Sequence, residues 1–160
     1  MLHLRSDSLA TTCAIAASLA GLTRRGDLIV LAGEMGAGKT AFAQGFGEAI
    51  GVSEPITSPT FTLIHSYPAG RVTLHHADIY RLTTHHEVAD LALGELLESD
   101  GIVMVEWGDV VAGSLGDHIL VRLEFDEADE NARTIEISAA GRAWAVRWDE
   151  IGRRLAAYTC

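Results

Sequence analysis

The sequence predicts one α/β domain over residues 1–160, in which helices cover both faces of a central sheet. Two continuous apolar runs, Leu28–Ala32 and Ile102–Val105, are typical of strands that are buried on both faces of a parallel sheet. Stretches with helical periodicity alternate with these runs, and this order favours an α/β fold. A chain of 160 residues, 48% of them hydrophobic, is long enough for one domain with a substantial core.

The first half of the chain is predicted to contain a helix, a strand and a second helix. Apolar residues recur at helical spacing across residues 7–25, and Ser6 or Ser8 can cap the start of this helix. The first apolar run follows directly and leads into a glycine-rich loop. Thr40–Ile50 is then predicted to be a helix that ends at Gly51, because glycine readily adopts the left-handed conformation found beyond helix ends.

The second half of the chain is predicted to contain a β-hairpin, further strands and two helices. Phe61–Tyr67 and Arg71–Tyr80 are expected to form the hairpin, with its turn at Pro68, Ala69 and Gly70. The pattern also predicts a helix over Thr84–Leu97, a late antiparallel pair of strands over Ile119–Phe125 and Arg133–Ser138, and a final helix over Trp144–Leu155.

Charge and cysteine content indicate the protein's surroundings and partners. The net charge of −10 opposes tight direct binding to a nucleic-acid backbone, because such affinity comes largely from lysine and arginine. Any action on nucleic acid is therefore expected to pass through a partner. Cys13 and Cys160 are expected to be free thiols, and we find no secretion signal and no membrane-spanning run. These features favour a cytoplasmic protein that does not enter a membrane.

The glycine-rich loop between the first apolar run and the next helix matches the phosphate-binding pattern G-x-x-x-x-G-K-[ST]. Its glycines let backbone N–H groups converge on an anion, and the following helix adds a partial positive charge. The lysine is expected to reach the β- and γ-phosphates of ATP, and the threonine hydroxyl to bind Mg²⁺. The loop therefore predicts a P-loop NTPase-like sheet with an ATP site. Its residues are Gly33, Glu34, Met35, Gly36, Ala37, Gly38, Lys39 and Thr40, with Ala41 next in the helix.

Two acidic residues at predicted strand ends are candidates for the carboxylate that a P-loop enzyme places opposite the loop. Glu106 ends the second apolar run, and Asp78 lies near the end of a hairpin strand. Such a carboxylate holds Mg²⁺ or its water and orients the attacking nucleophile. Either residue can take that role, and either can instead be a solvated acid at the edge of the sheet.

The remaining basic residues and histidines argue against several other kinds of site. Lys39 is the only lysine, so the Asn-Lys-x-Asp motif of guanine-specific GTPases is absent. His75 and His76 are neighbours on a predicted strand and face opposite sides, which argues against a shared zinc ion. His76 is expected to line or support the nucleotide site. Arg81 and Arg133 can each contact phosphate, but the arginines form no lid of the kind that kinases of small metabolites carry.

Four motifs follow one another along the chain, beginning with the phosphate loop and ending with Glu106-Trp107. Together they resemble the TsaE family, formerly YjeE, the small bacterial ATPases of tRNA threonylcarbamoyladenosine biosynthesis. The resemblance spans roughly Leu9 to Ser138, and the two middle motifs are far more specific than the loop alone. These two are Ser58-Pro59-Thr60-Phe61 and His76-Ala77-Asp78-Ile79-Tyr80-Arg81-Leu82.

The resemblance implies a function and a set of site residues. Members of the family bind and hydrolyse ATP with Mg²⁺, and they associate with the threonylcarbamoyl transferase subunit TsaD and its inactive paralogue TsaB. They thereby support repeated modification of adenosine 37 in tRNA, and they act on tRNA only indirectly. The resemblance places Thr60 in a switch-like segment near Mg²⁺ and makes Asp78, Glu106 and Trp107 ligand or catalytic candidates. The family often has Pro-Glu or Gly-Glu after Glu-Trp, so the shorter acid Asp109 leaves that position without an assigned role.

Two other functions remain open from the residues themselves. The small size and the strand–loop–helix start also suit a P-loop kinase, which would transfer the γ-phosphate of ATP to a small acceptor. A non-enzymatic, nucleotide-gated binding module would show the same loop, and slow turnover alone would not separate it from an ATPase. A Glu106→Gln variant separates these two, because a binding module would keep its full supporting activity without that carboxylate.

Overall fold

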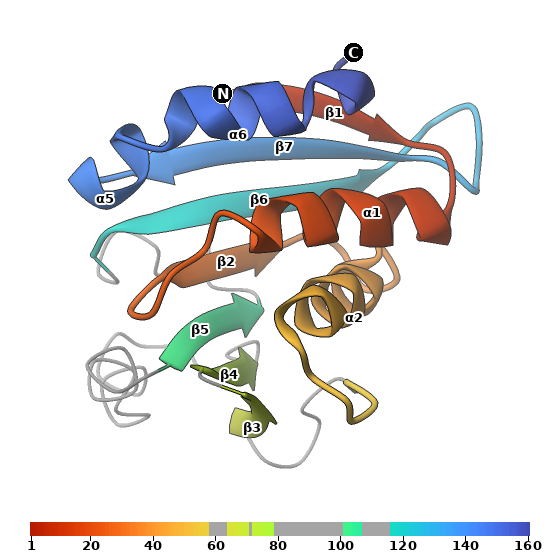
Figure 1. Ribbon diagram of the computed structural model, residues 1–160. Helices are drawn as coiled ribbons and strands as arrows, with labels where there is room; N and C mark the ends of the chain where they lie inside the picture. The colour runs from red at the N-terminus through yellow and green to blue at the C-terminus, as the bar shows by residue number, and fades with distance from the viewer. Residues whose placement is uncertain (58–63, 71, 79–100, 107–115) are drawn as a thin grey trace.

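Seven strands form one mixed sheet in the order β1-β7-β6-β2-β5-β4-β3 (Figure 1). This computed structural model describes residues 1–57, 64–70, 72–78, 101–106 and 116–160. The strands are β1 (Leu2–Ser6), β2 (Leu28–Ala32), β3 (Ile64–Ala69), β4 (Val72–Asp78), β5 (Gly101–Glu106), β6 (His118–Phe125) and β7 (Arg133–Ala140).

Two helix ends carry the capping residues that the sequence predicts. Ser8 caps the first helix as predicted, because its Oγ accepts a hydrogen bond from Thr11 N at 3.1 Å. The second helix ends at Gly51, whose φ of +107° is left-handed, again as predicted. Within the described ranges, no helix is both long and apolar enough to cross a membrane. The helices are α1 (Leu9–Ala20), α2 (Lys39–Ile50), α5 (Arg142–Ala145), α6 (Trp148–Arg154) and the short 3-10 helix η3 (Ala156–Tyr158).

The two apolar runs form the centre of the sheet, as predicted. Strand β2 is parallel to β5 on one side and to β6 on the other, and β4 is parallel to β5. All residues of β2 and β5 are buried. Because parallel strands end at the same edge of a sheet, the loop after β2 emerges beside the ends of β4 and β5. The register places Leu31 beside Glu106, and Glu106 beside Asp78.

Helices α1 and α2 lie together across one face of the sheet (Figure 1). Ile29 and Leu31 of β2 point to this face and belong to the same hydrophobic core as Ile15 of α1 and Phe46 of α2. Val30, which points to the opposite face, is also fully buried. The central strands are therefore buried on both faces, which is typical of parallel strands in an α/β sheet.

Contact between α1 and α2 depends on the absence of a side chain at Gly45. A Cβ atom at this position would lie 2.6 Å from both the Cα and the carbonyl oxygen of Cys13. We expect Gly45→Ala to lower the free energy of unfolding by about 1–3 kcal/mol, since the two helix backbones would have to separate. Gly152→Ala in α6 is the matched control, because its Cβ would have no neighbour within 4 Å. That variant should be slightly stabilised, and urea unfolding of both variants measures the difference.

A buried ion pair fastens the C-terminal helices to the turn before β2. The guanidinium of Arg147 donates to both carboxylate oxygens of Asp27 at 2.7 and 2.8 Å, and to Leu22 O at 2.9 Å. It also lies 3.9 Å from the centre of the Trp144 ring. Both charged side chains are only 7% exposed. This cluster ties α5 and α6 to the first half of the chain.

The two ends of the chain differ most from the prediction. A strand before α1 is not predicted, but β1 pairs antiparallel with β7. Burial alternates along this strand, but it has only five residues and Ser6, one of its two buried residues, is polar, so the sequence signal is weak. The single final helix predicted over Trp144–Leu155 is wrong, because the chain forms α5 and α6 on either side of Val146 and Arg147. The first helix is also shorter than predicted and is followed by Gly21.

The predicted hairpin and the late strand pair are confirmed with adjusted limits. Strands β3 and β4 pair antiparallel, as do β6 and β7. Strand β3 continues through Pro68 and Ala69, and the turn lies at Gly70, whose φ is +78°. Proline is tolerated there because β3 is an edge strand, where the missing N–H need not join a ladder. The helix predicted over Thr84–Leu97 lies outside the described residues.

Candidate functional site

The loop after β2 has a backbone that only glycine can form at its first position. Gly33 has a φ of +144°, and a Cβ atom there would lie 2.4 Å from the carbonyl oxygen of Leu123 in β6. Gly36 and Gly38 also have positive φ values, +85° and +109°. The neighbouring strand β6 therefore presses against the start of the loop. This close approach explains in physical terms why the pattern needs glycine at that point.

Two cationic side chains hold the carbonyl groups of the loop. The ammonium group of Lys39 donates to Gly33 O at 2.6 Å and to Glu34 O at 3.0 Å. The guanidinium of Arg133, on β7, donates to Ala37 O at 3.2 Å and to Gly36 O at 3.4 Å. In a trans peptide the next N–H points away from the carbonyl. Tying the carbonyls to these cations therefore turns the N–H groups of Glu34, Met35 and Gly38 the other way, whereas the Ala37 N–H donates to Glu34 O at 3.0 Å.

The loop leads directly into the N-terminus of α2, where Gly38 is the capping residue. Lys39 is the first residue of the helix and is only 7% exposed, and Thr40 and Ala41 follow it. A helix N-terminus attracts anions, and the lysine adds a full positive charge. These residues, predicted from the loop pattern, form one local cradle that fits a polyphosphate.

Both predicted carboxylates lie on the same sheet face as α2. Glu106 and Asp78 are register neighbours at the ends of β5 and β4, in the row that contains Leu31. Glu106 is 3% exposed, and its Oε1 atom has no hydrogen-bond partner among the residues that the structure describes. A buried carboxylate with an unpaired oxygen calls for a hydrogen-bond donor or a cation such as Mg²⁺, and its two oxygens can accept one of each. The same described residues contain no group of three or more potential metal ligands, so phosphate and water would have to complete the coordination.

The two adjacent histidines of β4 face opposite sides, as predicted. His76 lies in the row of Met104 on the α2 face, with its Nε2 atom 3.4 Å from Glu106 Oε1. On the other face, His75 Nδ1 forms a hydrogen bond of 2.8 Å with Ser66 Oγ. Burial lowers the pKa of His75. His76 therefore lies next to Glu106, one of the predicted acids, and its role in supporting the nucleotide site stays a prediction.

A hollow beside the loop is a part of the site that the sequence did not predict. It has a volume of about 620 Å³ and adjoins Gly38. We call it the Gly38 hollow. Its walls come from the start of α1 and from the turn before β7, two segments that lie far apart in the sequence. They include Ser8, Leu9, Thr12, Asn131 and Arg133.

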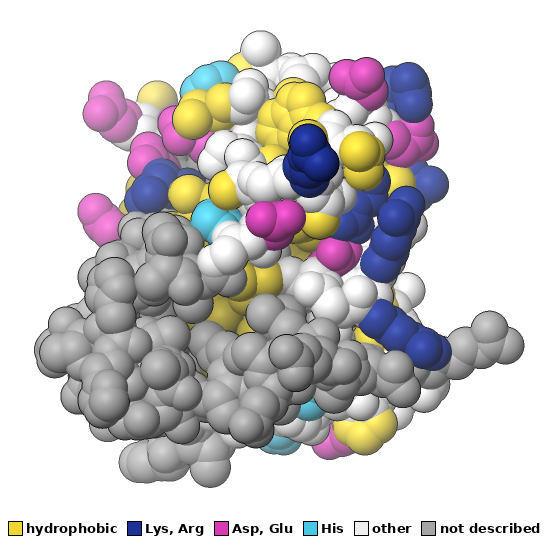
Figure 2. All heavy atoms as spheres, turned by 90° about the vertical axis from the view of Figure 1, so that its left-hand side faces the viewer, with side chains coloured by type: hydrophobic (Ala, Val, Ile, Leu, Met, Phe, Trp, Pro, Cys, Tyr) yellow, Lys and Arg dark blue, Asp and Glu magenta, His cyan; other side chains and the backbone are white. Residues whose placement is uncertain are grey.

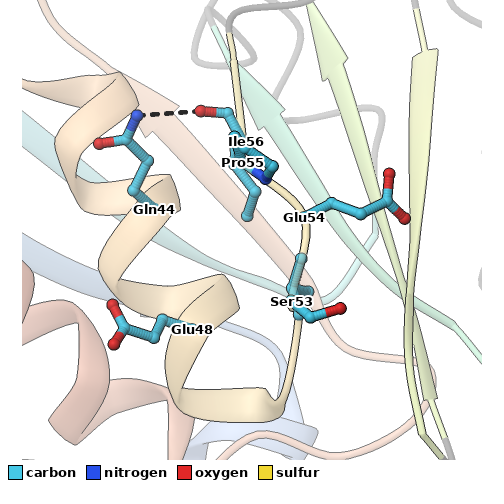
Figure 3. Close-up of a pocket in the computed structure, with 7 residues that line it drawn as sticks. Gln44, Glu48, Ser53, Glu54, Pro55 and Ile56 are labelled. Carbon is cyan, nitrogen blue, oxygen red and sulfur yellow. Dashed lines mark hydrogen bonds between the residues drawn. The ribbon is translucent and has the colours of Figure 1, made fainter.

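A second groove lies on the far side of α2, between this helix and the segment that follows it (Figure 3). Gln44 crosses its upper end and donates from Nε2 to Ile56 O at 2.9 Å. The carboxylates of Glu48 and Glu54 also border it. The Gly38 hollow is also bordered by two acids, Asp7 and Glu130, but it adjoins the loop and includes the cationic side chain of Arg133. It is therefore the better place for a nucleotide.

Several predicted site residues fall outside the described part of the chain. Thr60 and Trp107 are among them, and so are Asp109 and the rest of the motif that contains Thr60. The described chain reaches Thr57, whose N–H donates to the hydroxyl of Tyr67 at 3.3 Å. The roles predicted for Thr60 and Trp107 therefore stay predictions.

Comparison with known proteins gives a consistent result over most of the chain. The model of a family described as "Threonylcarbamoyl adenosine biosynthesis protein TsaE" matches residues 6–135. A Bacillus subtilis protein named tRNA threonylcarbamoyladenosine biosynthesis protein TsaE is 35% identical over 142 residues, which are 89% of this chain and 88% of the relative. A Streptomyces coelicolor protein of the same name is 40% identical over 134 residues, 79% of this chain and 89% of its own length.

A solved structure shows the same fold. The crystal structure of Bacillus subtilis YdiB superimposes with a TM-score of 0.75 at 30% sequence identity. The match covers 95% of this chain and 94% of the YdiB chain. The likeness therefore extends over the sheet and the helices as a whole, and not only over the phosphate loop.

Proposed function

This chain belongs to the TsaE family, and from that membership we propose that it is an ATPase that supports the threonylcarbamoyl transferase of tRNA modification. The family takes part in tRNA threonylcarbamoyladenosine biosynthesis. One observation carries the enzymatic part of the proposal. The phosphate loop and the buried carboxylate of Glu106 lie on neighbouring parallel strands at the same edge of the sheet.

Lys39 and the N-terminus of α2 bind the phosphates in this proposal. In the described structure the ammonium group of Lys39 already lies over the loop, where Gly33 O and Glu34 O accept its hydrogen bonds. A bound polyphosphate would offer it stronger, charged acceptors, for which Lys39 exchanges these two carbonyls. Its ammonium group then lies on the side of the loop's N–H groups, and together they orient the γ-phosphate for attack by water.

Thr40, Glu106 and Asp78 are the residues that would hold Mg²⁺ or its water. When bound, Mg²⁺ neutralises the charge that develops on the phosphate oxygens. Thr40 is at the start of α2, and both acids lie on the sheet face that α2 covers. Of the two acids, we assign Glu106 the position closer to Mg²⁺. Its carboxylate is buried and lies beside Leu31, two residues before the loop.

The nucleoside part of ATP is proposed to lie in the Gly38 hollow. The hollow adjoins the loop, its volume is in the range of small-molecule sites, and it offers both apolar and polar walls. Leu9 is 66% exposed there, which leaves an apolar surface for the base. Arg133 and Asn131 supply polar groups on the opposite wall.

The transferase subunit and its inactive paralogue, which are TsaD- and TsaB-like, are the proposed partners in the cytoplasm. A chain with a net charge of −10 is a poor direct ligand for tRNA. The face shown in Figure 2 carries acidic side chains next to basic ones. Some arginines are also neutralised by acids, as on α6, where Glu150 pairs with both Arg153 and Arg154. The net negative charge supports an action on tRNA through the partner enzyme.

We expect Glu106→Gln to bind ATP but to lower its turnover about 100-fold or more, because the neutral amide neither holds a cation well nor orients water. Phosphate release should be measured with and without the transferase pair. Glu48→Gln, the same change at an exposed residue of α2, is the matched control and should behave as wild type. Wild-type protein that neither associates with the transferase pair nor responds to it in phosphate release would refute the proposal, as would full activity of Glu106→Gln.

A further inference from the structure

We propose that His76 is a positioning residue for Glu106, which it holds through a hydrogen bond from Nε2–H to Oε1 when MgATP is bound. This inference rests on the proposed function and assigns a residue to the same site. It concerns a contact that the described structure already contains in an incomplete form. The two atoms lie 3.4 Å apart, beyond the usual N–H···O distance.

The sheet register brings these two side chains together. His76 and Asp78 are two residues apart on β4, so both point to the α2 face. Glu106 lies beside Asp78, on the neighbouring strand β5. His76 therefore lies two residues farther from the strand end than Asp78 and Glu106 do, and the Glu106 carboxylate turns back toward the His76 ring. In this position the His76 ring is near one carboxylate oxygen of Glu106. The other oxygen of Glu106 and the carboxylate of Asp78 are left for the phosphate side.

Burial shows that this contact is more than core packing. The side chain of His76 is 0% exposed, and that of Glu106 is 3% exposed. Among the described residues, His76 Nδ1, His76 Nε2 and Glu106 Oε1 have no hydrogen-bond partner. Buried polar atoms in native proteins are nearly always paired, and an apolar residue would fill this position at lower cost. Three unpaired atoms at one spot, on the sheet face that α2 covers, indicate an arrangement that is completed when a ligand is bound.

A residue that holds a metal-binding carboxylate in place, without touching the metal, affects the affinity for the metal. Residues that hold a metal-binding carboxylate through a hydrogen bond fix its orientation, and their loss typically costs about 10–100-fold in metal affinity or activity. His76 should therefore affect the Mg²⁺-dependent part of nucleotide binding. It should not affect the contacts that the loop and Lys39 make with phosphate alone.

The test measures the affinity for a non-hydrolysable ATP analogue by calorimetry, once with Mg²⁺ and once with EDTA. For His76→Leu we expect the gain in affinity from Mg²⁺ to fall about 10-fold or more, with the value in EDTA unchanged. His76→Gln places an amide N–H near the position of Nε2 and should keep most of the gain. His76→Asn places its amide near Nδ1 and should lose the gain. The KM for MgATP should rise in the same order as the affinity falls, and kcat should fall in that order because the carboxylate is no longer held in place.

His75→Leu is the matched control, because it makes the same change one residue away on the opposite face. An unchanged Mg²⁺ effect in folded His76→Leu, or an equal loss in His75→Leu, would overturn the inference and leave the ATPase proposal intact. If His76→Leu does not fold, equal behaviour of the Gln and Asn variants would overturn it. Wild-type protein that binds no ATP analogue would instead refute the proposed function, and the role of His76 with it.

Discussion

Lys39→Ala is expected to abolish measurable ATP binding at micromolar nucleotide. Lys39 is the only lysine in the chain, and its ammonium group lies over the phosphate loop, 2.6 Å from Gly33 O. Charge-assisted hydrogen bonds contribute about 1.5–3 kcal/mol each, so losing contacts to two phosphates lowers the affinity by roughly 100-fold or more. Calorimetric titration with MgATP measures this change directly.

The unique lysine also provides a second readout that does not require a variant. An amine-specific reagent can modify only Lys39 and the N-terminal amine, because no other lysine is present. MgATP should protect Lys39 from modification and leave the N-terminus reactive. Lys39→Met keeps the bulk of the side chain and should lose ATP binding while staying folded. Tight ATP binding by either variant would show that the nucleotide lies elsewhere.

Arg147→Ala is expected to cause the largest loss of stability. The substitution leaves the carboxylate of Asp27 buried, with only the Arg24 N–H, at 2.6 Å, as a remaining described hydrogen-bond donor. Breaking a buried pair in this way costs about 3–5 kcal/mol, because the remaining charge is desolvated without a counter-charge. For a domain of this size the unfolding midpoint should fall by roughly 6–20 °C in calorimetry.

Two further variants show whether the loss comes from the unpaired charge. Replacing both partners, as Asp27→Asn with Arg147→Met, removes the charges together and should recover much of the stability. Arg153→Ala removes an exposed arginine of α6 that pairs with Glu150, and it should leave the midpoint essentially unchanged. A midpoint for Arg147→Ala close to that of Arg153→Ala would show that the buried pair does not fasten the C-terminal helices.

The parts of the fold that depend on local pattern were predictable from the sequence. Leu28–Ala32 and Ile102–Val105 are continuous apolar runs and became the two buried central strands. The loop between β2 and α2 was predictable because its glycine and lysine spacing is local chemistry. Glu106 was predictable because it ends such a run, and the register then placed Asp78 beside it.

The parts that depend on distant pairing were not predictable. Strand β1 alternates over only five residues, too few for a clear signal, and its place is decided by β7. The Gly38 hollow is lined by the start of α1 and by the turn before β7, which are far apart in the sequence, so no local motif predicts it. Arg133 was expected at most as a phosphate contact, whereas its guanidinium braces the back of the loop through Gly36 O and Ala37 O.

The pairing of the first strand with the last has a consequence for synthesis on the ribosome. Leu2 lies opposite Ile137, so β1 has no strand to pair with until β7 has left the exit tunnel. Ser8, which lines the Gly38 hollow, lies just after β1 in the chain. This wall of the hollow therefore also takes its place only when β7 is available. The loop also waits for its contacts with Leu123 of β6 and Arg133 of β7. A nascent chain can therefore complete the loop and the Gly38 hollow only near the end of translation, since such long-range contacts form late.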